Sequence, residues 1–264
     1  MDRKLIYDVG VCDGSDTAYY LRRDFNVVGI EASPVMIDAL RRRFASNIAD
    51  GTLTILDVGV ADAEGELQFW VCDDVPEWSS FDQELASRNG ASHHSVIVKT
   101  RRFSDIVSEY GVPLYCKIDI EGQDRRCVES LLSAGDVPEY ISIEMAHADA
   151  SVDLELLHRL GYRRFKIISQ SVRAQPIRWL TSLSYALPDR PSRFLRRVER
   201  KLRGVTSDAD WKFSKTSSGP FGEGTPGRWR SRAEVLALWQ HLHDVDARYG
   251  RAGLRDWYDI HATR

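Results

Sequence analysis

Carboxylates recur where the apolar segments of this sequence end. The five segments concerned span residues 5–9, 27–30, 53–56, 114–120 and 140–145, and the acids are Asp8, Glu31, Asp57, Asp119 and Glu144. If the segments are parallel strands, their carboxyl ends share one edge of a sheet, which is where open α/β sheets bind ligands. A single acid of this kind is usually a turn residue. Five of them predict a polar ligand site.

The first apolar segment leads into a glycine-rich turn. Gly10 and Gly14 can adopt backbone angles that a side chain would forbid, and they let a ligand approach the main chain. The helix expected from Thr17 points its free N–H groups into the same space. Glu31 follows about twenty residues later, at the position where an acid accepts hydrogen bonds from ribose hydroxyls. The turn and Glu31 together predict a nucleoside-binding half-fold.

The turn departs from the fingerprint of dinucleotide-binding proteins. Counting from Gly10, the second and third glycine positions hold Cys12 and Ser15. Asp8 and Asp13 would repel a pyrophosphate, whereas they suit a ligand with positive charge. S-adenosylmethionine carries an ammonium and a sulfonium, so we expect it as the cofactor. The alternative is a tight strand–helix turn with Asp13 in solvent.

The third apolar segment ends where an adenine ring lies in folds of this kind. Asp57 or Asp62 could accept a hydrogen bond from the exocyclic amine, while Val58 and Val60 could enclose the ring. Acids in solvated loops are equally compatible with this segment.

The sequence KIDIEG brings three charged residues to one face of a buried strand. Alternation places Lys117, Asp119 and Glu121 together, at a cost unless they serve a site or each other. Asp119 or Glu121 could be the general base for a substrate hydroxyl, with Lys117 holding it in place. A divalent-metal site with Glu144 and His147, or a Lys117–Glu121 ion pair, are the alternatives.

Two stretches in the last third of the chain have distinctive patterns. Residues 190–203 predict a basic helix whose apolar stripe (Phe194, Leu195, Val198 and Leu202) packs on the domain, with a solvated outer side. An acidic glycan or a membrane surface is an alternative partner for this helix.

The second stretch, residues 217–229, combines glycines and prolines with Phe221 and Trp229. Aromatic faces suit sugar rings and glycine-hinged loops suit lids, so we expect an acceptor-binding lid. A disordered connection is the alternative.

Composition indicates a soluble globular protein. Of the 264 residues 43% are hydrophobic and 28% charged, and the net charge of −3 gives no support to a nucleic-acid partner. The four cysteines contain no C-x-x-C pair and predict reduced thiols in a cytoplasmic protein. We expect no signal peptide and no stable membrane insertion, because no apolar run approaches the length of a span.

Strand and helix patterns alternate through residue 168, which predicts a doubly wound, mostly parallel sheet. Residues 73–95 interrupt this pattern and are expected to form a surface loop. We place a core at residues 1–170 and an extension at 171–264, which contains a final sheet strand, the basic helix, the lid loop and a helical tail.

Five motifs together resemble the FkbM family of S-adenosylmethionine-dependent methyltransferases. They are DVGVCDGSDT (8–17), VVGIEASP (27–34), GVADAEGEL (59–67), KIDIEGQD (117–124) and ISIEMAH (141–147). The resemblance implies a class I methyltransferase (Rossmann-like) fold with seven strands, one of them antiparallel, and O-methylation of a sugar or natural-product hydroxyl. An NAD(P)-dependent oxidoreductase and a non-catalytic nucleoside-binding module are the alternatives.

Carried over by position, the resemblance gives roles to individual residues. Asp8, Gly10, Gly14 and Glu31 would contact the cofactor, and Asp62 would lie beside the adenine. Asp119 and Glu121 would face the substrate. Together with the reasoning above, the expected residues are Asp119, Glu121 and Lys117 for catalysis; Asp8, Gly10, Asp13, Gly14, Glu31, Ala32, Asp57 and Asp62 for the cofactor; Glu144, His147, Phe221 and Trp229 for the acceptor; and none for a metal.

Overall fold

A seven-stranded sheet forms the centre of the fold in the computed structural model, which describes residues 4–145, 150–249 and 256–264. The strands in spatial order are β3 (Leu53–Asp57), β2 (Asn26–Glu31), β1 (Leu5–Val9), β7 (Tyr115–Ile118), β8 (Tyr140–Glu144), β12 (Tyr258–Thr263) and β9 (Arg164–Ser169). β1 pairs in parallel with β2 and β7, whereas β12 pairs antiparallel to β9. The order and directions confirm the predicted class I methyltransferase fold.

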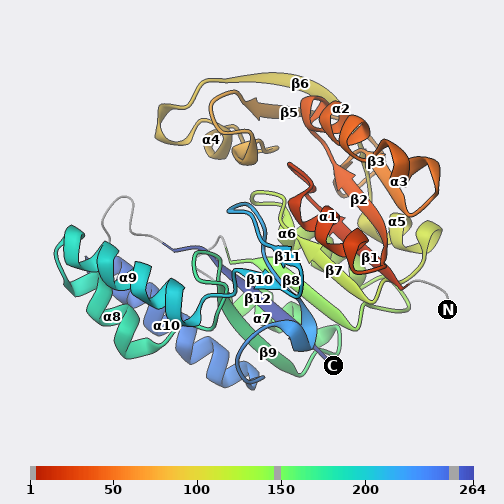
Figure 1. The fold of residues 1–264 in the computed structure, drawn as a ribbon. Coiled ribbons are helices and arrows are strands. Elements are labelled where there is room, and N and C mark those ends of the chain that lie inside the picture. Colours follow the sequence, from red (N-terminus) through yellow and green to blue (C-terminus); the bar gives the residue numbers. More distant parts are fainter. Residues whose placement is uncertain (1–3, 146–149, 250–255) are drawn as a thin grey trace. The chain divides into compact units, whose positions relative to one another are not determined.

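Contacts divide the chain within β8 into a first unit, Met1–Ile141, and a second unit, Ser142–Arg264. The predicted division at residue 170 stays a prediction. The helices of the first unit are α1 (Ser15–Arg22), α2 (Pro34–Arg43), α3 (Ala45–Ala49), α5 (Phe103–Tyr110) and α6 (Asp124–Leu131). Those of the second are α7 (Ala150–Arg159), α8 (Arg178–Ala186), α9 (Asp189–Arg203) and α10 (Arg232–Tyr249) (Figure 1).

Local sequence explains several boundaries in the first unit. Pro34 starts α2 because its fixed φ suits the first helical position, where no N–H is needed. Gly111 ends α5 with a φ of 91°, a conformation that side chains disfavour. The central strands are apolar on both faces, as expected for a parallel sheet covered by helices: the consecutive residues Ile6 and Tyr7 of β1, and Val27 and Val28 of β2, are all buried.

A small second sheet is inserted between β3 and α5. It has the order β4 (Gly59–Val60), β6 (His93–Arg101), β5 (Gly65–Cys72), and Phe69, Val71 and Val98 form its apolar core. The segment between β5 and β6 holds three short helices: η1 (Pro76–Trp78), α4 (Gln83–Ala86) and η2 (Arg88–Gly90) (Figure 1). The expectation of a plain surface loop over residues 73–95 was therefore wrong.

The second unit also corrects an expectation. The helix predicted at 190–203 is present as α9, but only part of its apolar stripe is covered: Leu195 and Val198 are half buried, whereas Phe194 is 66% and Leu202 77% exposed. β10 (Ser207–Asp208), β11 (Trp211–Lys212) and η3 (Gly222–Gly224) follow α9. No helix among the described residues has the length and apolar composition that crossing a bilayer requires.

Candidate cofactor pocket

A pocket lies within the first unit at the carboxyl ends of β1, β2 and β7. Most of its wall is apolar, and it is contributed by the strand ends and by the inserted segment. The lining residues are Gly10, Cys12, Ile30, Glu31, Ala32, Met36, Val58, Gly59, Val60, Phe69, Pro76, Glu77, Ser79, Phe81, Asp119, Ile120 and Glu121. A mostly apolar wall with a few polar groups is typical of small-molecule sites.

Gly10 forms the tightest point of the pocket wall. Its φ is 84°, and a Cβ there would lie 1.9 Å from the backbone oxygen of Asp119. Only glycine therefore lets the β1 turn pack against the end of β7. Gly14 has a different role, since a Cβ there would lie 2.5 Å from the ring of Phe44. Gly14 fits α1 against α2 and is not among the residues that line the pocket.

The carboxylate of Glu31 binds two backbone segments, the turn after β1 and the residues that follow β2. Oε2 accepts a hydrogen bond from the backbone N–H of Cys12 at 2.9 Å, and Oε1 accepts one from Ser33 at 2.8 Å. Burial raises the pKa of Glu31, although these amide bonds act in the opposite direction. Ala32 lines the pocket beside it. Glu31 thus fixes the backbone of the pocket and also lines it.

Two further acids of the turn lie outside the pocket wall. Asp13 accepts hydrogen bonds from the backbone N–H and the hydroxyl of Ser15, at 2.8 and 2.9 Å, and so stabilises the start of α1. Asp8 is fully buried and accepts a hydrogen bond of 2.6 Å from Thr17 Oγ1. Burial raises the pKa of Asp8 to about 6.

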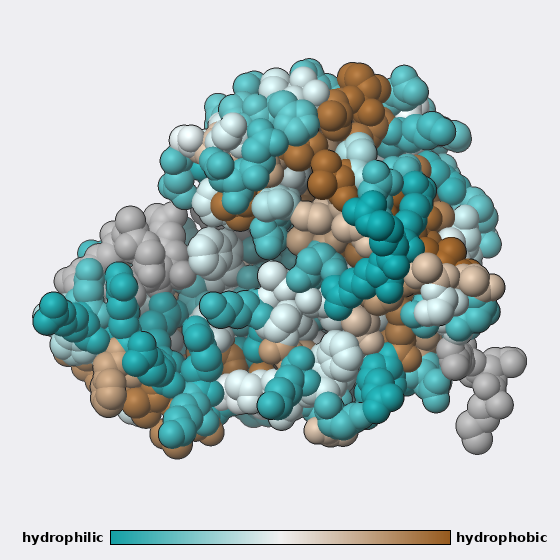
Figure 2. Space-filling view, turned by 45° about the horizontal axis from the view of Figure 1, so that its top comes forward, coloured by the Kyte–Doolittle hydropathy of each residue, from teal (hydrophilic) through white to brown (hydrophobic). Residues whose placement is uncertain are grey.

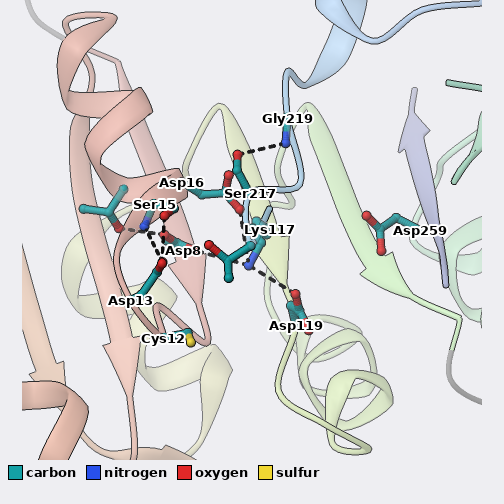
Figure 3. A network of polar contacts seen from close by, with 12 residues as sticks. Asp8, Cys12, Asp13, Ser15, Asp16, Lys117, Asp119, Ser217, Gly219 and Asp259 are labelled. Carbon is teal, nitrogen blue, oxygen red and sulfur yellow. Dashed lines mark hydrogen bonds and ion pairs between the residues drawn. The ribbon is translucent and has the colours of Figure 1, made fainter. Parts of the chain in front are cut away.

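A buried lysine joins three of the acids. Lys117 Nζ lies 3.4 Å from Asp119, 3.6 Å from Asp8 and 3.7 Å from Asp16 (Figure 3). Burial by itself would lower the pKa of Lys117, but these three carboxylates raise it well above its usual value. The ammonium is therefore charged, and it is surrounded by more negative than positive charge.

The two acids of the KIDIEG segment that line the pocket, Asp119 and Glu121, have different partners. The Asp119 side chain is 33% exposed and lines the pocket, with Lys117 on one side. Glu121 has a φ of 46° and forms a two-point ion pair with Arg88, at 2.8 and 2.9 Å. The backbone oxygen of Glu121 also accepts a hydrogen bond from Ser80 Oγ. The structure thus pairs Glu121 with Arg88 rather than with Lys117.

Asp57 and Asp62 are placed away from the pocket wall. Asp57 is half exposed and pairs with Arg41 at 3.3 Å. Asp62 is 76% exposed and pairs with Arg126. Val58, Gly59 and Val60, which lie between these two acids in the sequence, do line the pocket. The apolar residues of this segment therefore meet a ligand there, and the carboxylates point elsewhere.

The residues expected to bind the acceptor belong to the second unit. Glu144 is buried at the end of β8, and Phe221 is half buried. Trp229 donates from Nε1 to Glu223 at 2.9 Å, and Lys166 Nζ lies 4.2 Å from the centre of its ring. His147 lies outside the described residues. No cluster of three or more potential metal-binding His, Cys, Asp or Glu side chains occurs among the residues described.

Sequence reasoning missed the contribution of the inserted segment. Phe81 and Pro76 line the pocket, and Arg88 holds Glu121 while its guanidinium lies 4.4 Å from the ring centre of Trp78. A weak signal existed, because Trp78 and Phe81 are large aromatic residues in a stretch that is otherwise polar. Met36 of α2 was missed as well, since it follows the predicted strand by several residues.

The apolar slot, the carboxylate of Glu31 and the negative charge around Lys117 fit a nucleoside that carries positive charge. The strand order and this pocket define a class I S-adenosylmethionine-dependent methyltransferase.

Comparison with known proteins identifies the family. The model of the methyltransferase FkbM domain matches residues 8–164, more than half of the chain, and the chain belongs to this family. The cofactor is accordingly S-adenosylmethionine. The resemblance seen in the motifs is confirmed.

Individual relatives are more distant. The FkbM methyltransferase structure from Methylobacillus flagellatus KT is 17% identical with a TM-score of 0.43, and the match covers 62% of this chain and 40% of that one. A putative sarcosine dimethylglycine methyltransferase from Galdieria sulphuraria is 10% identical with a TM-score of 0.42, covering 100% of this chain and 79% of that one.

A probable ribosomal RNA small subunit methyltransferase A from Methanospirillum hungatei is 40% identical over 53 residues, which are 20% of this chain and 21% of that protein. The match thus spans about one fifth of the length of this curated relative.

Proposed function

We propose that this FkbM-family methyltransferase transfers the methyl group to a hydroxyl oxygen of a sugar, in a glycan, a glycolipid or a glycosylated natural product. The observation that carries the proposal is the position of Asp119, which lines the cofactor pocket as a partly exposed carboxylate. A hydroxyl is a poor nucleophile and needs a nearby group that orients it and accepts its proton.

The cofactor end of the site would be held by the residues around Gly10 and Glu31. Glu31 would accept hydrogen bonds from ribose hydroxyls through lone pairs that the amides of Cys12 and Ser33 leave available. Val58, Val60 and Phe81 would enclose the adenine. When bound, S-adenosylmethionine supplies a methyl group on a positively charged sulfur.

Asp119 would orient the acceptor hydroxyl in line with the bond to be broken and take its proton as the C–O bond forms. Lys117 would act as a positioning residue, because its ammonium fixes the Asp119 carboxylate at 3.4 Å. Glu121 is a weaker candidate for the base than the sequence implied, since both of its carboxylate oxygens bind Arg88. Its role would be to hold the inserted segment over the pocket.

Two aromatic residues of the second unit support the acceptor class. Phe221 and Trp229 are aromatic residues in a glycine-rich segment, and aromatic faces pack well against sugar rings. Cytoplasmic localisation, O-specificity and the roles of Glu144 and His147 are part of the same proposal.

The test is methyl transfer from radiolabelled S-adenosylmethionine to a panel of glycans and glycolipids, with Asp119→Asn as the variant. We expect kcat to fall by about 10²- to 10⁴-fold, because general-base assistance is lost. The affinity for S-adenosylhomocysteine should change by less than about fivefold.

Glu121→Gln is the matched control, since it also neutralises a carboxylate that lines the pocket. Equal losses of kcat in both variants would contradict the assignment of Asp119 as the base. Transfer only to amines, or to no sugar in the panel, would overturn the proposed acceptor class.

A further inference from the structure

The outward face of α9 combines basic and apolar side chains. Phe194 is 66% exposed. Arg190, Arg197 and Lys201 lie four residues before and three and seven residues after it, so they share its side of the helix. Leu202, 77% exposed, is next to Lys201. This face is what remains exposed after α9 has packed, since Ser192 on the opposite side is buried.

The basic residues of α9 differ between its two sides. On the inward side Arg196 pairs with Asp256 at 2.8 Å, and Arg203 pairs with Glu199. On the outward side Arg190, Arg193, Arg197, Arg200 and Lys201 form no ion pair with another described residue. The outward face therefore carries a concentrated positive charge, although the whole chain has a net charge of −3.

α8 adds two more exposed apolar side chains. Trp179 is 67% and Leu183 43% exposed, and they lie one turn apart on the same side of the helix. Only Leu187 and Pro188 separate α8 from α9, and the two helices pack against each other. At its lower left, where Figure 1 places α8, α9 and α10, Figure 2 shows brown hydrophobic residues among teal hydrophilic ones.

We propose that α9, assisted by α8, binds peripherally to a membrane surface that contains anionic lipids. A helix with arginines around a protruding phenylalanine and leucine suits the boundary between head groups and acyl chains, because the cations meet phosphates and the apolar side chains enter the boundary. A second copy of the same face would bring like charges together. A nucleic-acid duplex would use the arginines but would leave Phe194 and Leu202 in water.

This inference does not depend on methyl transfer, and its test uses no acceptor. The full chain is sedimented with phosphatidylcholine vesicles, with and without phosphatidylglycerol. We expect binding only to the anionic vesicles, weakened by added salt. The double variant Arg197→Gln/Lys201→Gln should bind about 25-fold more weakly, or about fivefold for each charge removed.

A second double variant tests the apolar part. Phe194→Ser/Leu202→Ser should lower vesicle binding by about tenfold or more, and it should leave the salt dependence in place. Ile97→Ser/Lys99→Gln is the matched control, since Ile97 is 65% exposed and Lys99 is exposed two residues further along β6 in the first unit. The control should bind as the unaltered chain does, and all variants should keep the melting temperature.

Three results would overturn the proposal. The first is equal binding to vesicles with and without phosphatidylglycerol. The second is binding to a DNA duplex that the Phe194→Ser/Leu202→Ser variant retains in full while vesicle binding is absent. The third is a dimer in solution that this same variant dissociates, because a second copy would then cover the face.

Discussion

The two units of the chain bury positive charge in different ways. In the first unit, Lys117 lies among three carboxylates, and one of them, Asp119, faces a ligand pocket. In the second unit, Lys166 is buried but donates to backbone oxygens, at 2.6 Å to Thr225 and 3.4 Å to Gly222. The buried cation of the first unit thus binds carboxylates, whereas that of the second unit binds the backbone of a loop.

Arg173, also in the second unit, is a buried cation that binds backbone oxygens, as Lys166 does. Its guanidinium donates to the backbone oxygens of Ser217 and Ser214, and its φ is 54°. Backbone carbonyls carry no net charge and do not titrate, so they fix a segment without creating a charged site. Carboxylates can be shared with a ligand or release and accept protons. Under the proposed function the first unit would perform the chemistry, while Lys166 and Arg173 hold the segment around residues 214–229 in the second unit.

Replacing Lys117 should lower the stability of the protein more than any other substitution considered below. Lys117→Met leaves Asp8, Asp16 and Asp119 without their buried cation, which should cost about 3–5 kcal/mol of the free energy of unfolding. Urea denaturation measures this loss, with Lys99→Met on the surface as the control. A loss below about 1 kcal/mol would show that the acids do not depend on Lys117.

Glu31→Gln should weaken the binding of S-adenosylhomocysteine by about 10- to 100-fold in calorimetry, because charged hydrogen bonds to ribose hydroxyls are lost. The variant also disturbs a backbone amide that Glu31 binds, so stability should fall as well.

Adenosine and 2′,3′-dideoxyadenosine separate the two roles of Glu31. If Glu31 binds the ribose, the original chain prefers adenosine and the variant loses most of that preference. An unchanged ratio of the two affinities would leave Glu31 with a structural role only. Asp57→Asn, outside the pocket wall, is the control.

Lys166→Met should have a smaller effect than Lys117→Met. It removes hydrogen bonds to two carbonyls but also removes the cost of burying a charge, so we expect a loss of about 1–2 kcal/mol. The segment around Thr225 should become easier to cleave in limited proteolysis, while cofactor affinity stays the same. Lys212→Met is the surface control. Weaker cofactor binding in Lys166→Met would break the division of roles between the units.

His261 should make the stability of the second unit depend on pH. It is buried, neither ring nitrogen has a hydrogen-bond partner among the described residues, and burial lowers its pKa to about 3. A lowered histidine pKa gives stability that is present above about pH 6.5 and lost as the pH falls toward 3. Below pH 6.5 the free energy of unfolding should fall by roughly 1.4 kcal/mol for each pH unit.

Denaturation at pH 7.5 and 5.5 measures this dependence for the original chain and for His261→Leu, which should be less sensitive to acid. His94→Leu, at an exposed histidine, is the control. Equal acid sensitivity of the original chain and His261→Leu would assign the pH dependence to other groups.

Much of the fold could be predicted from sequence because it depends on local patterns. The helix predicted at 190–203 agrees with α9, and the first apolar segment is the strand Leu5–Val9. α8 was missed, since its residues follow the end of the regular strand–helix alternation. The inserted segment was misjudged because its helices are too short to produce periodicity.

Some of the residues predicted for the site line one pocket, and others point away from it. Gly10, Glu31 and Asp119 line one pocket, as acids and glycines at strand ends suggest. Asp57 and Asp62 fall in the same sequence segment as true lining residues but point to Arg41 and Arg126. Side-chain direction in a loop depends on distant partners, and spacing along the chain carries no information about them.

By itself the sequence determined the alternation of strands and helices, the acidic character of the strand ends and the family, because these depend on periodicity and on motifs of adjacent residues. Only the tertiary structure decided that Lys117 lies among three acids, that Glu121 pairs with Arg88, and that Phe194 and Leu202 of α9 are exposed. Each of these depends on which residues, far apart in the chain, come within reach of one another, and burial and charge pairing follow from that proximity.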